Sequence, residues 1–149
     1  MSINWDNVEF KDDKRFLSNM FPVTVVIDGI SYPSPENYYM SMKFATVCDK
    51  LVTELQECTP LNSKTIANKN KDKIRPDWDD IKLGVMRVGV MAKFAQNTSL
   101  VKQLLDTGDE YLEERNDWND TFWGTYQGKG SNHLGSLLME VRNYYKGLL

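Results

Sequence analysis

The segment from Trp78 to Gln96 constrains the fold most, because it is long, contains no proline and follows Pro76 and Asp77. An aspartate directly before such a segment is a good helix cap, so one long helix is predicted. At about 100° per residue, the apolar side chains of this helix fall on two arcs. The first arc holds Ile81, Val85, Val88, Ala92 and Ala95, and the second holds Leu83, Val90 and Phe94. A helix that is apolar on two sides is expected at the centre of its fold.

A strip of mainly polar residues runs between these two arcs, within about 60° of arc on the helix surface. It consists of Trp78, Lys82, Gly89, Lys93 and Gln96. We expect this strip to face either solvent or a cavity. Periodicity alone favours lysines that reach outward from a partly exposed helix, and the alternative is that Lys82 and Lys93 bind an anion.

The segment before this helix predicts a hairpin followed by a helix. β-Branched and apolar residues at 23–27 and 30–32 flank Asp28-Gly29, which is a strong two-residue turn. Ser34 then caps a helix that is expected to reach about Val47. Its first turn contains Pro35, which suits the first helical position, and Glu36, whose charge the helix dipole stabilises.

Further helices are expected at residues 49–57, 62–71 and 100–107, with Pro60 interrupting the chain between the first two. Residues 111–114 form a possible short strand, and Ser131 is expected to cap a final helix that reaches Tyr145. The chain has no repeat or linker, and its 149 residues suit one domain. We therefore predict a single domain, residues 1–149, with a mainly α-helical α+β fold and a small β-hairpin.

Composition excludes several classes of protein. The net charge of −3 argues against a dedicated nucleic-acid binder, although a local basic patch remains possible. No apolar run approaches the roughly 20 residues that span a membrane, and residues 1–6 lack signal-peptide features, so we expect a cytoplasmic protein. His133 is the single histidine, and Cys48 and Cys58 are expected to remain thiols. We expect no metal site and no cofactor.

Two carboxylates are candidates for chemistry. Glu36 is interpreted either as an ordinary acid at a helix start or as a base, nucleophile or charge stabiliser held on a rigid helix. Asp120 lies among aromatic residues that include Phe122 and Trp123. Spacing alone favours Asp120 as a turn cap over a catalytic group by roughly two to one, whereas the aromatic neighbours favour a ligand pocket.

The glycine-rich run from Gly124 to Ser131 is not a phosphate loop of the Walker type. Its first glycine is too close to Gly128-Lys129, and Gly130 follows the lysine where Ser or Thr is required. A weaker expectation remains, because backbone amides, Lys129 and the start of the last helix at Ser131 and Asn132 can hold an anion.

Four separated segments together resemble the YbiA-like, or NADAR, family. The segments are Phe16-Leu17-Ser18-Asn19-Met20; Tyr32 to Tyr39 with Lys43-Phe44; Trp78 to Lys82 with Met86 and Lys93-Phe94; and Asp120 to Gly124 with Gly128 to Gly135. The resemblance implies a small, mainly helical N-glycosidase that cleaves the bond between ribose and a nitrogen base or amine. The substrate classes it implies are phosphoribosylated aminopyrimidines and ADP-ribose attached to guanine in nucleic acid.

The resemblance also implies roles for particular residues. Catalytic positions are Glu36, Asp120, Trp78 and Trp123; ligand contacts are Ser18, Asn19, Lys43, Lys82, Lys93, Gly124, Lys129 and Asn132. The chain departs from the family pattern at Met20, at Asn37 and across residues 67–75. We expect the last two departures to change substrate choice more readily than reaction type.

Hydrolysis of a ribosyl C–N bond is the primary hypothesis, with Glu36 as the main catalytic carboxylate. Asp120 would position the ribose or handle protons, Trp78 and Trp123 would hold the ligand, and lysines would bind phosphate. In this hypothesis, Glu36 and the strip form one wall of the site, and Asp120 with Trp123 forms the other. The alternatives are a non-catalytic sensor of ADP-ribose or an NAD derivative, and a structural protein whose aromatics are all core. The oligomeric state is not indicated.

Overall fold

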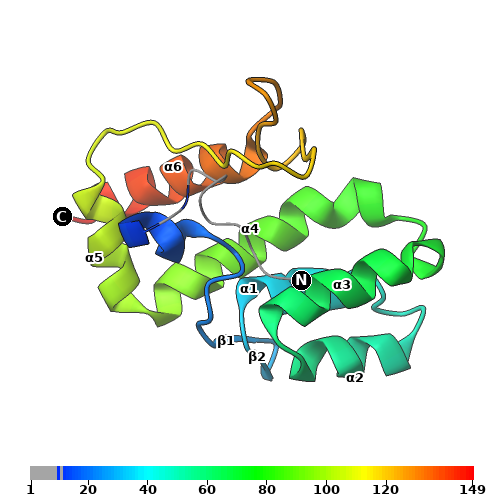
Figure 1. Ribbon diagram of the computed structural model, residues 1–149. Coiled ribbons are helices and arrows are strands. Elements are labelled where there is room, and N and C mark those ends of the chain that lie inside the picture. Colours follow the sequence, from blue (N-terminus) through cyan, green and yellow to red (C-terminus); the bar gives the residue numbers. More distant parts are fainter. Residues whose placement is uncertain (1–9, 11) are drawn as a thin grey trace. The chain divides into compact units, whose positions relative to one another are not determined.

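The computed structural model describes residue 10 and residues 12–149, which form two compact units (Figure 1). The first unit spans residues 19–96, and the second comprises the described residues before 19 together with residues 97–149. Residues 1–6, which lack signal-peptide features in the sequence, lie outside the described residues. That residues 1–149 act as one domain stays a prediction.

The hairpin of the first unit forms where the sequence places it. Strand β1 (Val25–Ile27) pairs antiparallel with β2 (Ile30–Tyr32), so that Ile27 lies opposite Ile30. Asp28 and Gly29 both have positive φ, at 53° and 78°, as the tight turn between twisted strands requires. The strand β1 is shorter than the predicted 23–27. Gln96 adds to the hairpin from the end of the long helix, because its side-chain amide bonds both the N–H and the carbonyl of Val26 at 2.8 and 2.7 Å.

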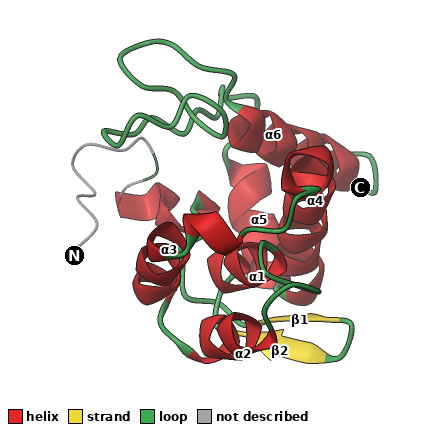
Figure 2. Ribbon diagram, turned by 90° about the vertical axis from the view of Figure 1, so that its right-hand side faces the viewer, coloured by secondary structure: helices red, strands yellow, loops and turns green. Residues whose placement is uncertain are grey.

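Helices make up the rest of the first unit: α1 (Pro35–Met42), α2 (Asp49–Glu57), α3 (Pro60–Lys69), the short 3-10 helix η3 (Lys71–Lys73) and α4 (Trp78–Gln96). Helix α1 packs against α2, α3 and α4, while the hairpin packs against α4 and α2 (Figures 1 and 2). The bounds of α2 and α4 match the sequence prediction. The core of this unit includes Val25, Phe44, Leu55, Val90 and Phe94.

Several helix boundaries differ from prediction, including the end of α3 at Lys69 rather than at residue 71. Helix α1 ends at Met42 rather than near Val47, and turns that include Thr46 at φ 73° follow it. Pro60 does not interrupt the chain but occupies the first turn of α3, where its missing N–H costs nothing. Thr59 caps that helix, because its hydroxyl accepts a hydrogen bond from the N–H of Asn62 at 3.2 Å.

Helix α4 buries one face, and the prediction of two buried arcs was wrong. Leu83 and Val88 are 50% and 46% exposed. The buried residues are Trp78, Val85, Met86, Gly89, Val90, Lys93 and Phe94. Three members of the predicted polar strip therefore lie on the buried face. Gly89 allows close packing there, because a Cβ atom would lie 3.1 Å from the ring of Tyr38 on α1.

The second unit contains the 3-10 helix η2 (Asp12–Leu17), α5 (Thr98–Asp106) and α6 (His133–Lys146). Helices α5 and α6 pack together, and the segment 107–132 joins them (yellow to orange in Figure 1). The predicted strand at 111–114 is absent from this described segment, which makes only an isolated bridge between Arg115 and Thr125 near that point. The cap of α6 is Asn132, with φ 52°, rather than Ser131.

The fold class is α+β, mainly α-helical, with one two-stranded antiparallel sheet among the described residues. This confirms the class predicted from the sequence. Searching the described part of the chain for a helix that is both long and apolar enough to cross a membrane finds none.

Candidate active site

Glu36 stands at the start of α1, where two contacts hold the backbone in place. The hydroxyl of Ser34 accepts a hydrogen bond from the N–H of Asn37 at 3.1 Å, which caps the helix. The N–H of Glu36 itself donates to the carbonyl of Asn19 at 3.0 Å. The partly buried Glu36 carboxylate is therefore carried on a fixed helix end, where the helix dipole stabilises negative charge.

An aromatic pair with a cation lies where α1 meets the start of α4. The rings of Tyr39 and Trp78 meet edge to face, with centroids 5.0 Å apart. The ammonium nitrogen of Lys43 lies 5.5 Å from the Tyr39 centroid and 6.0 Å from that of Trp78, within the range of cation–π attraction. Burial lowers the pKa of Lys43, and the negative charge of Glu36 opposes that effect. The carboxylate and the ammonium thus act on each other electrostatically.

Asn19 contributes a buried amide to the same unit. Its Nδ2 donates to the sulfur of Met86 at 2.9 Å, and the residue is only 5% exposed. Its Oδ1 is buried and has no hydrogen-bond partner among the described residues. A buried acceptor of this kind is costly unless a donor reaches it, so the Asn19 amide suits a ligand contact, as the family resemblance implies.

The two strip lysines differ in environment. Lys93 is fully buried, with its ammonium 5.9 Å from the ring of Phe21 and 5.4 Å from that of Phe94, so it does not reach outward. Lys82 lies nearer the surface, where its ammonium pairs with Asp79 at 3.1 Å. The prediction of outward lysines is therefore wrong for Lys93.

Asp120 of the second unit organises a turn. Its Oδ1 accepts hydrogen bonds from the N–H groups of Phe122 and Trp123 at 3.0 and 2.9 Å. Asn116 completes the turn, since its side chain bonds both the N–H and the carbonyl of Asp120. The turn-cap interpretation of Asp120 is thus confirmed, while its catalytic role stays a prediction.

The aromatic residues after Asp120 form a cluster. The rings of Phe122 and Trp123 meet edge to face with centroids 4.8 Å apart, and the ring centroid of His133 lies 4.6 Å from that of Phe122. Trp123 is partly buried rather than a core residue. An indole that is partly exposed beside a fixed turn suits stacking on a ligand ring.

The start of α6 does not offer free amides to an anion. The N–H groups of residues 131–134 donate to the carbonyls of Thr121, Gly124, Phe122 and Trp123. The weaker expectation of an anion held by this helix end is therefore wrong for these amides. Gly124 is required by packing, because a Cβ atom there would lie 2.0 Å from the carbonyl oxygen of Glu114.

The side chain of Asn132 bonds other parts of the second unit, and the structure gives its predicted ligand contact no support. Its Nδ2 donates to the carbonyl of Leu112 at 3.0 Å and to the hydroxyl of Tyr111 at 3.3 Å. Its Oδ1 accepts from the N–H of Glu114 at 3.0 Å, and the residue is 2% exposed. Both side-chain N–H donors are therefore already used. The exposed side chain of Lys129 and the buried Ser18 stay predicted contacts.

Asn37, expected to alter substrate choice, instead joins α1 to α2. Its Nδ2 donates to the carbonyls of Leu55 and Cys58 at 2.9 and 2.8 Å, and its side chain is fully buried. This departure from the family pattern is thus a packing feature. Cys48 and Cys58 at the two ends of α2 are free thiols, as expected.

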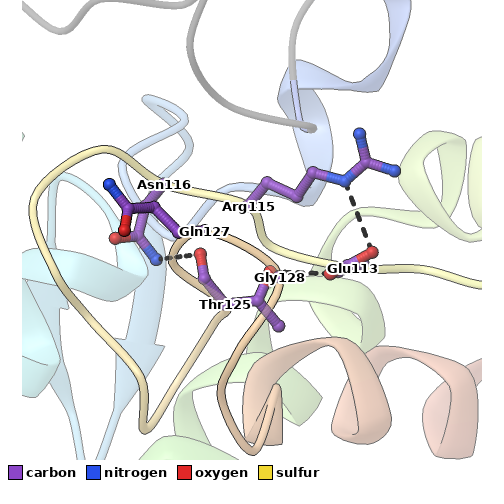
Figure 3. Close-up of a pocket in the computed structure, with 6 residues that line it drawn as sticks. All are labelled: Glu113, Arg115, Asn116, Thr125, Gln127 and Gly128. Atoms are coloured by element: carbon purple, nitrogen blue, oxygen red, sulfur yellow. Dashed lines mark hydrogen bonds and ion pairs between the residues drawn. The ribbon is translucent and has the colours of Figure 1, made fainter.

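A hollow of about 480 Å³ opens in the second unit (Figure 3). Within it the carboxylate of Glu113 accepts a hydrogen bond from the hydroxyl of Thr125 at 2.6 Å and pairs with Arg115 at 3.4 Å. The lining residues are Glu113, Arg115, Asn116, Thr125, Gln127 and Gly128. None of the predicted site residues lines it. In the part of the chain that the structure describes, no cluster of His, Cys, Asp and Glu side chains could hold a metal ion.

The predicted site residues thus fall into two groups. The first unit contains Asn19, Glu36, Lys43, Trp78, Lys82 and Lys93, and it adds Tyr39, which the sequence analysis missed. The second unit contains Asp120, Trp123, Gly124, Lys129, Asn132 and Ser18. The expected pairing of Glu36 with Asp120 joins residues of both units and stays a prediction. The position of Tyr39, three residues after Glu36 on one helix, is the signal that could have found it.

Comparison with known proteins identifies the class. The NADAR domain model matches residues 4–145. A riboflavin biosynthesis protein of Vibrio vulnificus is 39% identical over 133 residues, covering 88% of this chain but 35% of that protein. An N-glycosidase of Nostoc punctiforme is 36% identical, covering 89% of this chain and 86% of the relative. The chain belongs to the NADAR domain family.

The solved structures include a member with the same fold. The NMR structure of the Escherichia coli protein YbiA matches with a TM-score of 0.81 and 32% identity, over 93% of this chain and 82% of that one. The E. coli N-glycosidase YbiA is 34% identical by sequence over 133 residues. The family predicted from the four sequence segments is therefore confirmed.

Proposed function

We propose that this chain hydrolyses the C–N bond between a ribose and a nitrogen base or amine, with Glu36 as the catalytic carboxylate. It is an enzyme, a hydrolase that acts on N-glycosyl bonds, as the names of its relatives indicate for their own activity. The observation that carries the role of Glu36 is its position. Its N–H is fixed on the carbonyl of Asn19, and its charge lies close enough to Lys43 to oppose the lowering of that residue's pKa by burial.

The chemistry requires negative charge at a fixed place. When the C1′–N bond breaks, the leaving base or amine takes the bonding electrons and a proton, and positive charge remains on the ribose. Water adds its hydroxyl to C1′ and releases a proton. A carboxylate held on a helix end stabilises the cationic transition state without reorganising, either by its charge or as a covalent nucleophile.

The neighbours of Glu36 suit the remaining parts of such a substrate. The aromatic pair of Tyr39 and Trp78 offers ring surface for a base or for the charged sugar. Lys43 supplies a cation for phosphate. We propose that Asp120 and Trp123 act on the same substrate, Asp120 by orienting the ribose or transferring protons and Trp123 by stacking.

The proposed substrates carry ribose phosphate or ADP-ribose. They include phosphoribosylaminopyrimidines and ADP-ribosylated guanine, free or in nucleic acid. For the second kind, a single extruded nucleotide needs only a short basic patch, which an acidic chain can supply. The match covers 35% of the V. vulnificus riboflavin biosynthesis protein. A place in riboflavin synthesis is therefore not established for this chain, and it forms part of this proposal.

Mass spectrometry with labelled water tests the proposal. The protein is incubated with an ADP-ribosylated oligonucleotide and, separately, with phosphoribosylaminopyrimidines in H₂¹⁸O. Release of the free base or amine, with ¹⁸O on the sugar product, is the expected result. Saturable binding of ADP-ribose without bond cleavage in any substrate would instead establish the non-catalytic sensor.

A further inference from the structure

Asn116 is a buried asparagine whose side chain spends its hydrogen-bonding capacity within one loop. Its Oδ1 accepts from the N–H groups of Trp118 and Asp120 at 3.3 and 2.9 Å. Its Nδ2 donates to the carbonyls of Asp120 and Thr125 at 2.8 and 3.0 Å, and the contact with Thr125 is drawn in Figure 3. An asparagine side chain offers two donors and two acceptor lone pairs, so this one is fully used by the protein. Any function of Asn116 is therefore exerted through the residues that it holds.

Backbone hydrogen bonds hold Asn116 itself in place. Its N–H donates to the carbonyl of Thr125 at 3.0 Å, and the N–H of Thr125 donates to the carbonyl of Glu114 at 2.8 Å. The hydroxyl of Thr125 donates to the carboxylate of Glu113 at 2.6 Å. A Cβ atom on Gly124 would lie 2.9 Å from Nδ2 of Asn116, so glycine leaves the space that the amide occupies. The amide therefore has a fixed location between the two sides of the loop.

The carboxylate of Asp120 is carried by the peptide that Asn116 holds. The Asn116 side chain bonds both the N–H and the carbonyl of Asp120. The Asp120 Oδ1 accepts from the N–H groups of Phe122 and Trp123. The second carboxylate oxygen, Oδ2, has no partner among the described residues. Oδ2 is therefore the oxygen of Asp120 that can meet a substrate, and its position depends on the Asn116 amide.

The far end of the same turn is held separately. The N–H groups of the first two residues of α6 donate to the carbonyls of Phe122 and Trp123 at 3.1 and 2.9 Å. The position of Trp123 hence depends on α6, whereas that of Asp120 depends on Asn116. Removal of the Asn116 amide is expected to displace the carboxylate more than the indole.

We propose that Asn116 is the positioning residue of Asp120 in C–N hydrolysis. This inference rests on the proposed N-glycosidase function and deepens it. A carboxylate that orients a ribose or transfers a proton has to meet the reacting atoms closely, and a displacement of about 1 Å can cost on the order of 100-fold in rate. Asn116 fixes the peptide that carries this carboxylate and touches no substrate itself. The sequence motif that begins at Asp120 does not contain Asn116, and the contact is visible only in the folded loop.

The test compares loss of this amide with loss of another bonded side chain in the same unit. Asn116→Ala removes the contacts, and Asn116→Ser returns a hydroxyl that makes the local turn more weakly. Thr107→Ala is the control, because the Thr107 hydroxyl donates to the Leu104 carbonyl at 2.6 Å and accepts from Arg142 at 2.8 Å, outside the Asp120 turn. Asn116→Ala is also made in an Asp120→Asn background. Melting temperature, kcat and KM are measured with an ADP-ribosylated oligonucleotide and with phosphoribosylaminopyrimidines.

We expect Asn116→Ala to lower kcat about tenfold or more, with a smaller change in KM, and Asn116→Ser to recover part of the loss. Melting temperature should fall in both Asn116→Ala and Thr107→Ala, whereas kcat should fall only in the first. In the Asp120→Asn background, Asn116→Ala is expected to cost no further turnover, because the group that it positions has already lost its charge.

Full kcat in a folded Asn116→Ala variant, or an equal loss of kcat in Thr107→Ala, would overturn the positioning function. A loss of the same factor in the Asp120→Asn background would overturn it too, since Asn116 would then act through other residues. The unmodified protein separates these outcomes from failure of the proposed function. If it cleaves neither substrate, the enzymatic function and the positioning within it are both rejected, whereas cleavage that is insensitive to Asn116→Ala rejects the positioning alone.

Discussion

The backbone N–H of Glu36 donates to the carbonyl of Asn19 at 3.0 Å, which joins the start of α1 to the segment before the hairpin. The contact brings Asn19, whose side-chain amide is buried, next to Glu36, which carries the carboxylate. It also uses one of the N–H groups that a helix start leaves without an intrahelical partner. The direction in which α1 begins is therefore fixed by this backbone hydrogen bond together with the Ser34 cap.

Replacing Asp120 separates its turn function from its charge. Asp120→Asn keeps an oxygen that can accept from the N–H groups of Phe122 and Trp123, whereas Asp120→Ala does not. We expect Asp120→Ala to lower the free energy of unfolding by roughly 1–2 kcal/mol, as for other lost caps, and Asp120→Asn by much less. Urea unfolding measures both changes.

The same pair of variants tests catalysis by Asp120. Asp120→Asn is expected to lose most of its turnover, because the oxygen remains but the charge does not. A folded Asp120→Asn variant with full kcat would restrict Asp120 to the turn.

Lys43→Met is expected to weaken the binding of phosphorylated substrates and to keep or raise the stability of the fold. Burial lowers the pKa of Lys43, so the folded state holds this proton less tightly than the unfolded chain does. Between the lowered pKa and the ordinary value of 10.5, the unfolded state binds more protons, and stability from this group rises with pH. Methionine removes the charge and keeps an apolar stem.

We therefore expect Lys43→Met to unfold at equal or higher urea concentration at pH 7, while its KM for phosphorylated substrates rises. Lys50→Met, at an exposed lysine of α2, is the control. A clear loss of stability in Lys43→Met alone would show that the cation–π contacts outweigh the cost of burial.

Because of Tyr38, we expect the folded protein to lose stability at alkaline pH. Burial raises its pKa from 10.0 to about 12, with smaller contributions from Tyr32 and Asp28. The folded pKa lies above the unfolded one, so the stabilisation is complete below pH 10 and is lost as the pH rises through about 12. Tyr38→Phe should show a shallower decline in melting temperature across this window. Identical declines in the two proteins would contradict the assignment.

Asn132→Ala is expected to destabilise the second unit. It removes the partner of the Glu114 N–H and of the Leu112 carbonyl at once. At about 1–3 kcal/mol for each buried group left unpaired, the loss should exceed that from most surface changes. The control is Asn143→Ala, at an exposed asparagine of α6, and denaturant unfolding of both variants gives the comparison.

Local signals predicted much of the fold. The turn at Asp28-Gly29 and the bounds of α2 and α4 depend on short-range rules, and these hold. The errors arise where contacts between residues far apart in the sequence determine helix ends and buried faces. Asn132 rather than Ser131 stands at the N-cap position of α6, and its side chain bonds the segment around Leu112, twenty residues earlier, instead of capping the helix. Periodicity also could not show which face of α4 would meet α1, so the exposure of Leu83, on one of the two apolar arcs, was not predicted.

The candidate site was predicted in part for the same reason. Glu36 and Trp78 follow from motifs, and helical spacing links Glu36 to Lys43. Helical spacing also places Tyr39 near Glu36, but its contact with Trp78 depends on how α1 meets the start of α4, which spacing along one helix does not reveal.

Turnover by Glu36→Gln tests the central claim most directly. The amide keeps the size of the side chain and removes its charge, and Glu57→Gln, at an exposed glutamate of α2, is the matched control. We predict that Glu36→Gln binds ADP-ribose nearly as the unmodified protein does, while kcat for C–N hydrolysis falls about 100-fold. Glu57→Gln should retain normal turnover. A Glu36→Gln variant with near-normal kcat would contradict the assignment of Glu36 as the catalytic carboxylate.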